Sequence, residues 1–182
     1  MSFFFASQAL TWVLLAVTFS ACSPSLNWRE TRIGETGLTA LFPCKPDQIA
    51  RLVPLASAPV EIHLTACDAG GASFAISHAE FIDGRTAQEG LANWRKATLA
   101  NMSTGSAIET PIRIRQSSST GTVPFDSAVR MVKADGKRQD GSNVGLNGVW
   151  LVSGKRVFHA AIYAPKITAE MSETFFSGLG FQ

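Results

Sequence analysis

The stretch VEIHLTACDAGGASFAISHAEF, residues 60–81, decides the fold of this chain. Apolar and polar side chains alternate along residues 60–66, which is the period of a β-strand with one buried face and one wet face. Residues 68–71, Asp-Ala-Gly-Gly, have the composition of a tight turn, and residues 72–81 return as a second apolar strand. The stretch therefore predicts an antiparallel β-hairpin.

A helix is expected directly after this hairpin. Thr86 and Glu89 have the spacing of a capping box, in which a hydroxyl and a carboxylate each bind a free backbone amide at the start of a helix. Side chains at three- and four-residue spacing then form one stripe, which we expect to pack on the sheet and to bury Trp94. The stripe consists of Ala87, Leu91, Trp94, Thr98 and Met102.

The same patterns predict further strands on both sides of this unit and one more helix. The strands are expected at residues 28–33, 38–42, 49–55, 108–116, 128–134, 144–152 and 156–163. The last helix is expected at Ala169–Ser177, with Thr168 as its cap and Gly178 at its end. This order predicts an α+β fold, in which an antiparallel sheet is covered on one face by the central helix and the C-terminal helix.

The length and charge of the chain limit what it can be. Its 182 residues suffice for one domain, which we place at residues 27–182. Only 16% of the residues are charged and the net charge is +2, so there is no electrostatic reason to expect a nucleic-acid partner. All charged residues follow Cys22.

The first residues have the pattern of a bacterial export signal. The apolar segment at residues 10–19 has the length of a signal-peptide core, and small residues precede Cys22. Residues 19–22, Phe-Ser-Ala-Cys, resemble the lipobox, which implies cleavage before Cys22 and acylation of this cysteine. We therefore expect a signal peptide at residues 1–21, a lipidated cysteine with a short tether at residues 22–26, and a domain in the periplasm. The lipid would anchor it to the cell membrane or the outer membrane.

Two alternatives to a lipid anchor stay open. Residues 3–21 are nearly as long as the roughly 20 residues that cross a bilayer, so an uncleaved transmembrane anchor is one. Ordinary cleavage to a secreted protein is the other. Two features depart from the usual lipoprotein signal and leave both alternatives open. Phe19 stands where a lipobox usually has Leu, and residues 1–8 carry no Lys or Arg.

Apart from Cys22, the chain has two cysteines, which can pair with each other. Cys44 and Cys67 each follow a predicted strand, and paired thiols are oxidised in an exported protein. We expect a structural disulfide with the two α-carbons within about 7 Å of each other. A redox or metal pair is the alternative, but the two residues lack Cys-x-x-Cys spacing.

Two short motifs carry a resemblance to known proteins. They are Asn-Trp-Arg at residues 27–29 and Phe-Pro-Cys-Lys-Pro at residues 42–46. With the order of elements, they resemble envelope lipoproteins of proteobacteria and the PsbP/Mog1/DcrB-like fold. The resemblance implies a binding or assembly module and supplies no catalytic residues.

Candidate chemistry is sparse. His63 and His78 lie on the two strands of the first hairpin, where they could share a face with Glu61 or Glu80 as a metal or acid–base site. The alternative is two histidines on the solvent side of the sheet, because a one-residue change of register reverses the faces. We expect His159 to be a satisfied residue on a polar face.

A cluster of basic residues surrounds a long polar loop. Lys137 and Arg138, with Lys133 and Arg130 nearby, could contact lipid headgroups or peptidoglycan, although a solvated hairpin explains the same pattern.

The sequence thus predicts a membrane-tethered, non-enzymatic binding or assembly module without a cofactor. Its partners would be the lipid bilayer, through acylated Cys22, and an envelope protein or polymer. The alternatives are an enzyme, either a hydrolase or a metal-dependent protein with scattered His and carboxylate residues, and a purely structural envelope protein.

Replacing Cys22 tests the anchor. Cys22→Ala should leave unprocessed precursor and abolish labelling by a radioactive fatty acid, because no other residue offers a thiol at the cleavage point. The Cys44→Ala variant serves as the control and should be processed and labelled normally. Normal processing and labelling of Cys22→Ala would contradict the lipoprotein assignment.

Overall fold

The computed structural model describes residues 26–55, 59–104, 106–116 and 129–182. The predicted signal peptide and Cys22 lie outside these residues. The strands are β1 (Arg29–Arg32), β2 (Leu38–Phe42), β3 (Asp47–Val53), β4 (Val60–Ala69), β5 (Ala72–Glu80), β6 (Ala107–Pro111), β7 (Arg115–Gln116), β8 (Arg130–Lys137), β9 (Asn143–Ser153), β10 (Arg156–Ala164) and β11 (Gly180–Phe181). The helices are α1 (Gly84–Asn101) and α2 (Ala169–Ser177).

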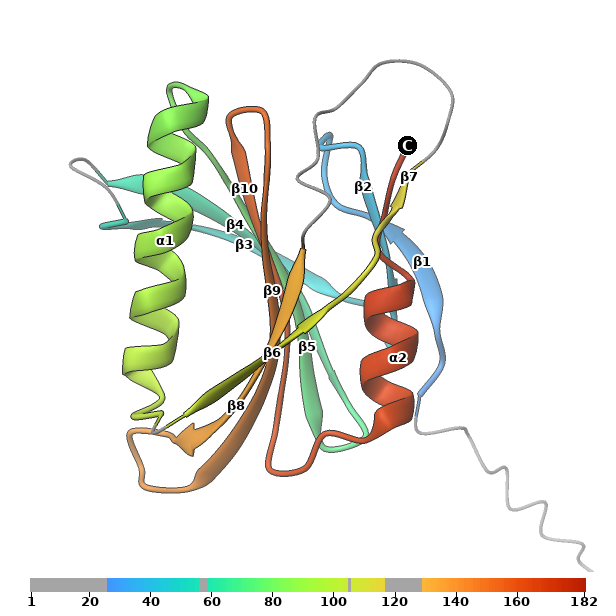
Figure 1. Cartoon of the computed structure of the whole chain (residues 1–182). Helices are drawn as coiled ribbons and strands as arrows, with labels where there is room; N and C mark the ends of the chain where they lie inside the picture. The colour runs from blue at the N-terminus through green and yellow to red at the C-terminus, as the bar shows by residue number, and fades with distance from the viewer. Residues whose placement is uncertain (1–25, 56–58, 105, 117–128) are drawn as a thin grey trace, which may run out of the picture.

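The described strands form two sheets (Figure 1). A seven-stranded sheet has the order β3-β4-β5-β10-β9-β8-β6, and a four-stranded sheet has the order β1-β2-β11-β7. Every pair in the larger sheet is antiparallel, whereas β11 and β7 in the smaller one run parallel. The predicted α+β class is confirmed.

The predicted hairpin is formed by β4 and β5. Gly70 and Gly71 make the turn with φ values of +58° and +76°, a conformation that glycine adopts without strain. The register places His63 directly opposite His78. Strand β5 then pairs with β10, a strand more than seventy residues later in the chain.

The two helices lie on opposite faces of the seven-stranded sheet, so the expectation that both cover one face is wrong (Figure 1). Phe158 and Ile162 of β10 point into the core on the α2 side, while Val157 and Ala161 of the same strand point into the core on the α1 side. Because both faces of β10 are apolar, each face needs its own cover.

The α2 side is closed by aromatic packing. Phe175 of α2 contacts Phe42 of β2 and Phe74 of β5 with ring centroids 5.8 Å and 5.5 Å away. The helix begins after Thr168, whose hydroxyl accepts a hydrogen bond from the Met171 amide, and this confirms the predicted bounds of the last helix. The α2 helix and the small sheet thus share one core.

The α1 helix begins earlier than predicted. Its cap is Asp83, whose carboxylate accepts from the Thr86 amide at 2.8 Å, while the Thr86 hydroxyl accepts from the Asp83 amide at 3.2 Å. The capping box therefore joins Asp83 to Thr86, and the predicted start at Thr86 is wrong. Trp94 is buried as expected, with 8% exposed. Neither helix of the described chain is long and apolar enough to cross a membrane.

The strand predicted at residues 108–116 is divided between the two sheets. Strand β6 ends at Pro111, which has no amide hydrogen for a ladder, and the Ile112 amide binds the Val129 carbonyl instead. The chain then crosses to the small sheet as β7, beside β11. The short strand β11 was not predicted.

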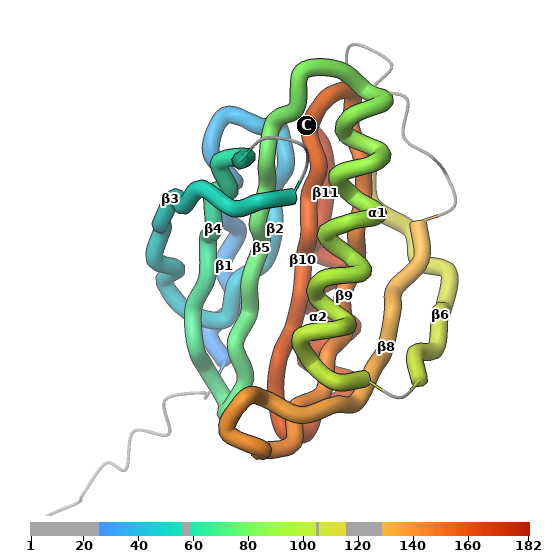
Figure 2. The backbone as a smooth tube through the Cα atoms, turned by 90° about the vertical axis from the view of Figure 1, so that its left-hand side faces the viewer, coloured from blue at the N-terminus to red at the C-terminus, as the bar shows by residue number. Residues whose placement is uncertain are grey.

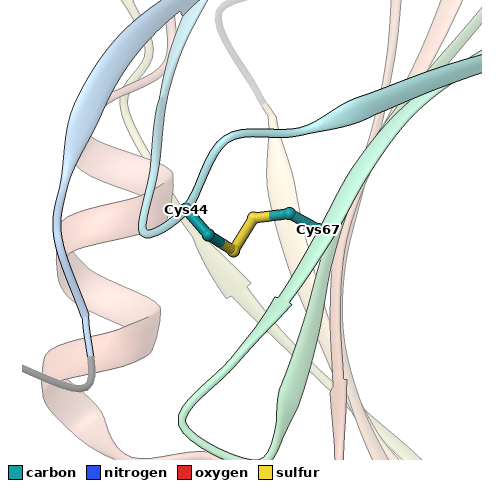
Figure 3. The surroundings of a disulfide bond; sticks show 2 residues. All are labelled: Cys44 and Cys67. Carbon is teal, nitrogen blue, oxygen red and sulfur yellow. A yellow bond between two sulfur atoms is a disulfide. The ribbon is translucent and has the colours of Figure 1, made fainter.

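The disulfide between Cys44 and Cys67 is present, which confirms the predicted pair (Figure 3). The two α-carbons are 6.1 Å apart, within the limit that the pairing requires. Cys44 follows β2 and Cys67 lies in β4, so the bond joins the small sheet to the large one.

Reduction of this bond should lower the free energy of unfolding by about 3 kcal/mol, because it frees a loop with a sequence separation of 23 in the unfolded chain. Urea unfolding with and without reductant measures the difference. The Cys44→Ala/Cys67→Ala double variant is the control and should be insensitive to the reductant. An unchanged wild-type midpoint on reduction would contradict the expected contribution.

Candidate functional site

Helix α1 covers only part of its face of the seven-stranded sheet. It packs on β9 and β10, and β3, β4 and the outer side of β5 extend beyond it (Figure 2). On this uncovered part, Ile49 of the edge strand β3 is 47% exposed. An apolar strip of sheet therefore faces outward next to the helix.

A groove of about 370 Å³ lies between α1 and this strip. This volume falls within the roughly 300–1,000 Å³ of typical small-molecule sites. Its apolar lining comes from strands β3, β4, β5 and β10 and from α1: Ile49, Val53, Ile62, Leu64, Ala75, Ala161 and Trp94. Its polar lining comes from the same elements: Arg51, Ser77, Thr98, His159 and Tyr163.

The floor of the groove is hollow where two small residues, Ala75 and Ala161, lie side by side, as part of a row of small residues across four strands. Ala66, Ala75, Ala161 and Gly148 are cross-strand neighbours in β4, β5, β10 and β9. A Cβ atom on Gly148 would lie 2.9 Å from the ring of Trp150, so the glycine leaves room for the indole. The register of the sheet thus creates a row of small residues, which the Trp150 indole fills over Gly148 and which stays hollow at Ala75 and Ala161.

Three aromatic rings pack against one another between α1 and the sheet. His159 stacks on Trp150, its cross-strand neighbour, at a centroid distance of 4.2 Å and an interplanar angle of 11°. Trp94 of α1 meets His159 edge-on at 5.7 Å. These contacts fix the position of the imidazole.

His159 is buried, with 5% exposed, so the expectation of a satisfied residue on a polar face is wrong. Its Nε2 and the Nε1 of Trp150 have no hydrogen-bond partner among the described residues. A buried polar atom without a partner costs about 1–3 kcal/mol, and the sites where proteins accept this cost are often functional.

Burial keeps the titratable groups of the groove neutral. It lowers the pKa of His159 to about 3 and raises the pKa of Tyr163 to about 12. Arg51 is then the one charged residue among those that line the groove. Its side chain is exposed, and it forms no ion pair within the described part of the chain.

The predicted histidine pair lies on the opposite face of the sheet. His63 and His78 stack with centroids 4.9 Å apart, which confirms that their strands are adjacent and that they share a face. With Glu61, Glu80, Arg156 and the β1–β2 turn, they line a polar pocket of about 350 Å³. His63 is largely exposed and His78 is partly buried.

The carboxylate of Glu80 in this pocket is already paired with two cations. Glu80 binds Lys155 at 2.6 Å and Arg156 at 3.0 Å, and Glu61 lies 3.3 Å from Nε2 of His63. Burial, followed by the electrostatic effects of neighbouring His63 and Arg156, lowers the pKa of His78 to about 4. Within the described ranges, no group of three or more His, Cys, Asp and Glu side chains is placed to hold a metal ion.

The basic residues around the β8–β9 hairpin do not converge on a site. Lys133, Lys137 and Arg138 are exposed, and Arg130 binds Glu109 at 3.0 Å. The hydrogen bonds from Arg95 and Arg130 lower the pKa of Glu109. This end of the sheet is a solvated surface with local ion pairs.

Sequence reasoning found the histidine pair and missed the groove. The groove depends on which residues of β5 and β10 lie opposite each other, and these strands are far apart in the chain. The available signal was the small residues on one face of each strand, such as Ala75 and Ala161.

Comparison of the chain with models of known families, with curated proteins and with solved structures finds no match. Function is therefore inferred from the geometry of the chain itself.

Burial of His159 predicts acid sensitivity. The unfolded histidine takes up a proton near its ordinary pKa of 6.5, whereas in the folded chain its pKa is about 3, so stability is complete above pH 6.5 and falls as the pH is lowered from there. The slope for this residue approaches about 1.4 kcal/mol per pH unit. Urea unfolding between about pH 4.5 and pH 6.5 measures it, above most carboxylate titration.

His159→Phe keeps a ring on Trp150 and should remove the part of the slope that His159 contributes, leaving the part from His78, whose pKa is also lowered, to about 4. His63→Gln, at an exposed histidine, should retain the part from His159. A wild-type slope in His159→Phe would show that another group causes the acid sensitivity.

Proposed function

We propose that this chain is a periplasmic lipoprotein, tethered through acylated Cys22, whose domain at residues 27–182 binds a small apolar ligand. The ligand occupies the groove between α1 and strands β3–β5. The observation that carries the proposal is this groove: an apolar, preformed hollow beside buried His159, whose Nε2 has no hydrogen-bond partner among the described residues.

The sequence supports the location. The apolar segment at residues 10–19 and the lipobox-like residues 19–22 favour export and lipidation. The Cys44–Cys67 disulfide is of the kind that persists in oxidising compartments. On the motifs at residues 27–29 and 42–46, we place the domain with the PsbP/Mog1/DcrB-like envelope lipoproteins.

Geometry supports binding through the groove. Isolated apolar residues on a surface are common, but a hollow lined by a continuous apolar strip marks a ligand or partner site. Ile49, Leu64 and Ala75 belong to three neighbouring strands and contribute to one such strip. A ligand there would bury this surface without any rearrangement of the sheet.

The histidine pocket favours the rival enzyme less well. A hydrolase or metal-dependent enzyme would use His63 and His78 with a nearby carboxylate as base or ligand. Glu80 is held by two cations, and the described residues offer no group of three or more side chains placed to hold a metal ion. Binding is therefore the better-supported function.

Filling the groove tests this function. The full chain in isolated membranes is exposed to decanol carrying a photoreactive diazirine, and labelled peptides are mapped by mass spectrometry. The wild type should be labelled on β4 and α1. In Ala75→Trp the new side chain fills the floor of the groove. Labelling of these peptides should fall at least about tenfold, which corresponds to about 1.4 kcal/mol of binding free energy.

Ala97→Trp is the matched control, because Ala97 lies on the exposed side of α1. It should keep wild-type labelling of the groove peptides. Equal labelling of these peptides in the wild type and in Ala75→Trp would contradict the proposed site.

A further inference from the structure

We infer that the ligand of the groove is an amphiphile whose single oxyanion, a carboxylate or a phosphate, is bound by Arg51 while its hydrocarbon part lies between α1 and the sheet. This inference rests on the proposed function and specifies the class of ligand.

Arg51 is placed for such a contact. It lies in the edge strand β3, directly opposite Ile62, and its neighbours on the same face are Ile49 and Val53. All four side chains line the groove. The aliphatic stem of an arginine in this position adds to the apolar lining while the guanidinium stays in water at the rim.

The charge of Arg51 has no ion-pair partner among the residues that the structure describes. The lining contains no acidic residue, and the ion pairs of the described chain all lie elsewhere. A guanidinium presents a planar set of donors that bind a carboxylate or phosphate through two parallel hydrogen bonds. A cationic ligand would be repelled, and a neutral one would leave this donor set unused.

The rest of the groove selects the other part of the ligand. Away from β3, the lining is formed by Leu64, Ala75, Ala161 and the ring of Trp94, with Tyr163 and His159 uncharged. A second charge placed here would lose its water without gaining a counter-ion. The charge at the rim and the apolar surface inside therefore define the orientation of the ligand. Its charged head lies at β3, and its hydrocarbon part points towards α1.

Matched photoreactive probes test the inference. Four diazirine probes with the same decyl chain, namely the carboxylate, the phosphate, the alcohol and the amine, are compared on the full chain in isolated membranes at neutral pH. In the wild type, the two anions should label the groove peptides roughly tenfold more than the alcohol, the equivalent of about 1.4 kcal/mol. The amine should label them least.

Arg51→Gln should reduce labelling by the two anions to the level of the alcohol and leave the alcohol unchanged, whereas Arg51→Lys should keep part of the preference. Arg138→Gln, which removes an exposed arginine of the β8–β9 hairpin, should behave as the wild type. Stronger labelling by the carboxylate would point to free fatty acids, and stronger labelling by the phosphate to phosphorylated lipids. Both results support the inference.

Two results would overturn it. If the alcohol and the anions label the groove equally in both the wild type and Arg51→Gln, the inference that Arg51 binds an oxyanion is wrong. The proposed apolar site would then still hold. If no probe labels the groove peptides above the level of Ala75→Trp, the proposed function fails as well.

Discussion

A single helix cannot cover a whole face of the seven-stranded sheet, and this mismatch governs the rest of the structure. Strands are spaced about 4.8 Å apart, so the sheet is about 29 Å wide, whereas a helix with its side chains is about 10–12 Å across. On one face the chain uses a second sheet and α2 together as cover. On the other face, the cover from the described part of the chain is α1, which lies on β9 and β10 and leaves most of β3, β4 and part of β5 open.

The sheet keeps a largely apolar surface on this open strip, with few polar side chains. Ile49, Ile62 and Leu64 keep an apolar surface beside the helix, and the alanines at 75 and 161 make it concave. A surface of this kind on an edge strand carries a risk of aggregation, which proteins usually reduce with charges. Arg51 supplies one charge at the rim. The same residue that protects the edge is therefore available to a ligand.

Local patterns predicted the features that depend on neighbouring residues, and failed where distant segments meet. The alternation at residues 60–66, the Thr168 cap and the cysteine pair needed no tertiary information. The side of the sheet on which α2 lies, the short strand β11 and the row of small residues depend on pairings between distant strands. His159 is an example. Its position between Phe158 and Ala160 in an alternating strand predicted a polar face, but in the structure it packs against Trp150 and Trp94.

The position of the proposed anchor at Cys22 relative to the groove bears on where a ligand would come from. Leu26, the first described residue, packs with the core on the α2 side, close to Gly70 in the β4–β5 turn. Three residues lie between it and Cys22, so the two α-carbons are about 14 Å apart at most when the chain is fully extended. The groove opens on the other side of the sheet, beside α1. A domain anchored through Cys22 would therefore hold the groove on the side of the sheet that faces away from its attachment point. In this position the groove is open to an external ligand.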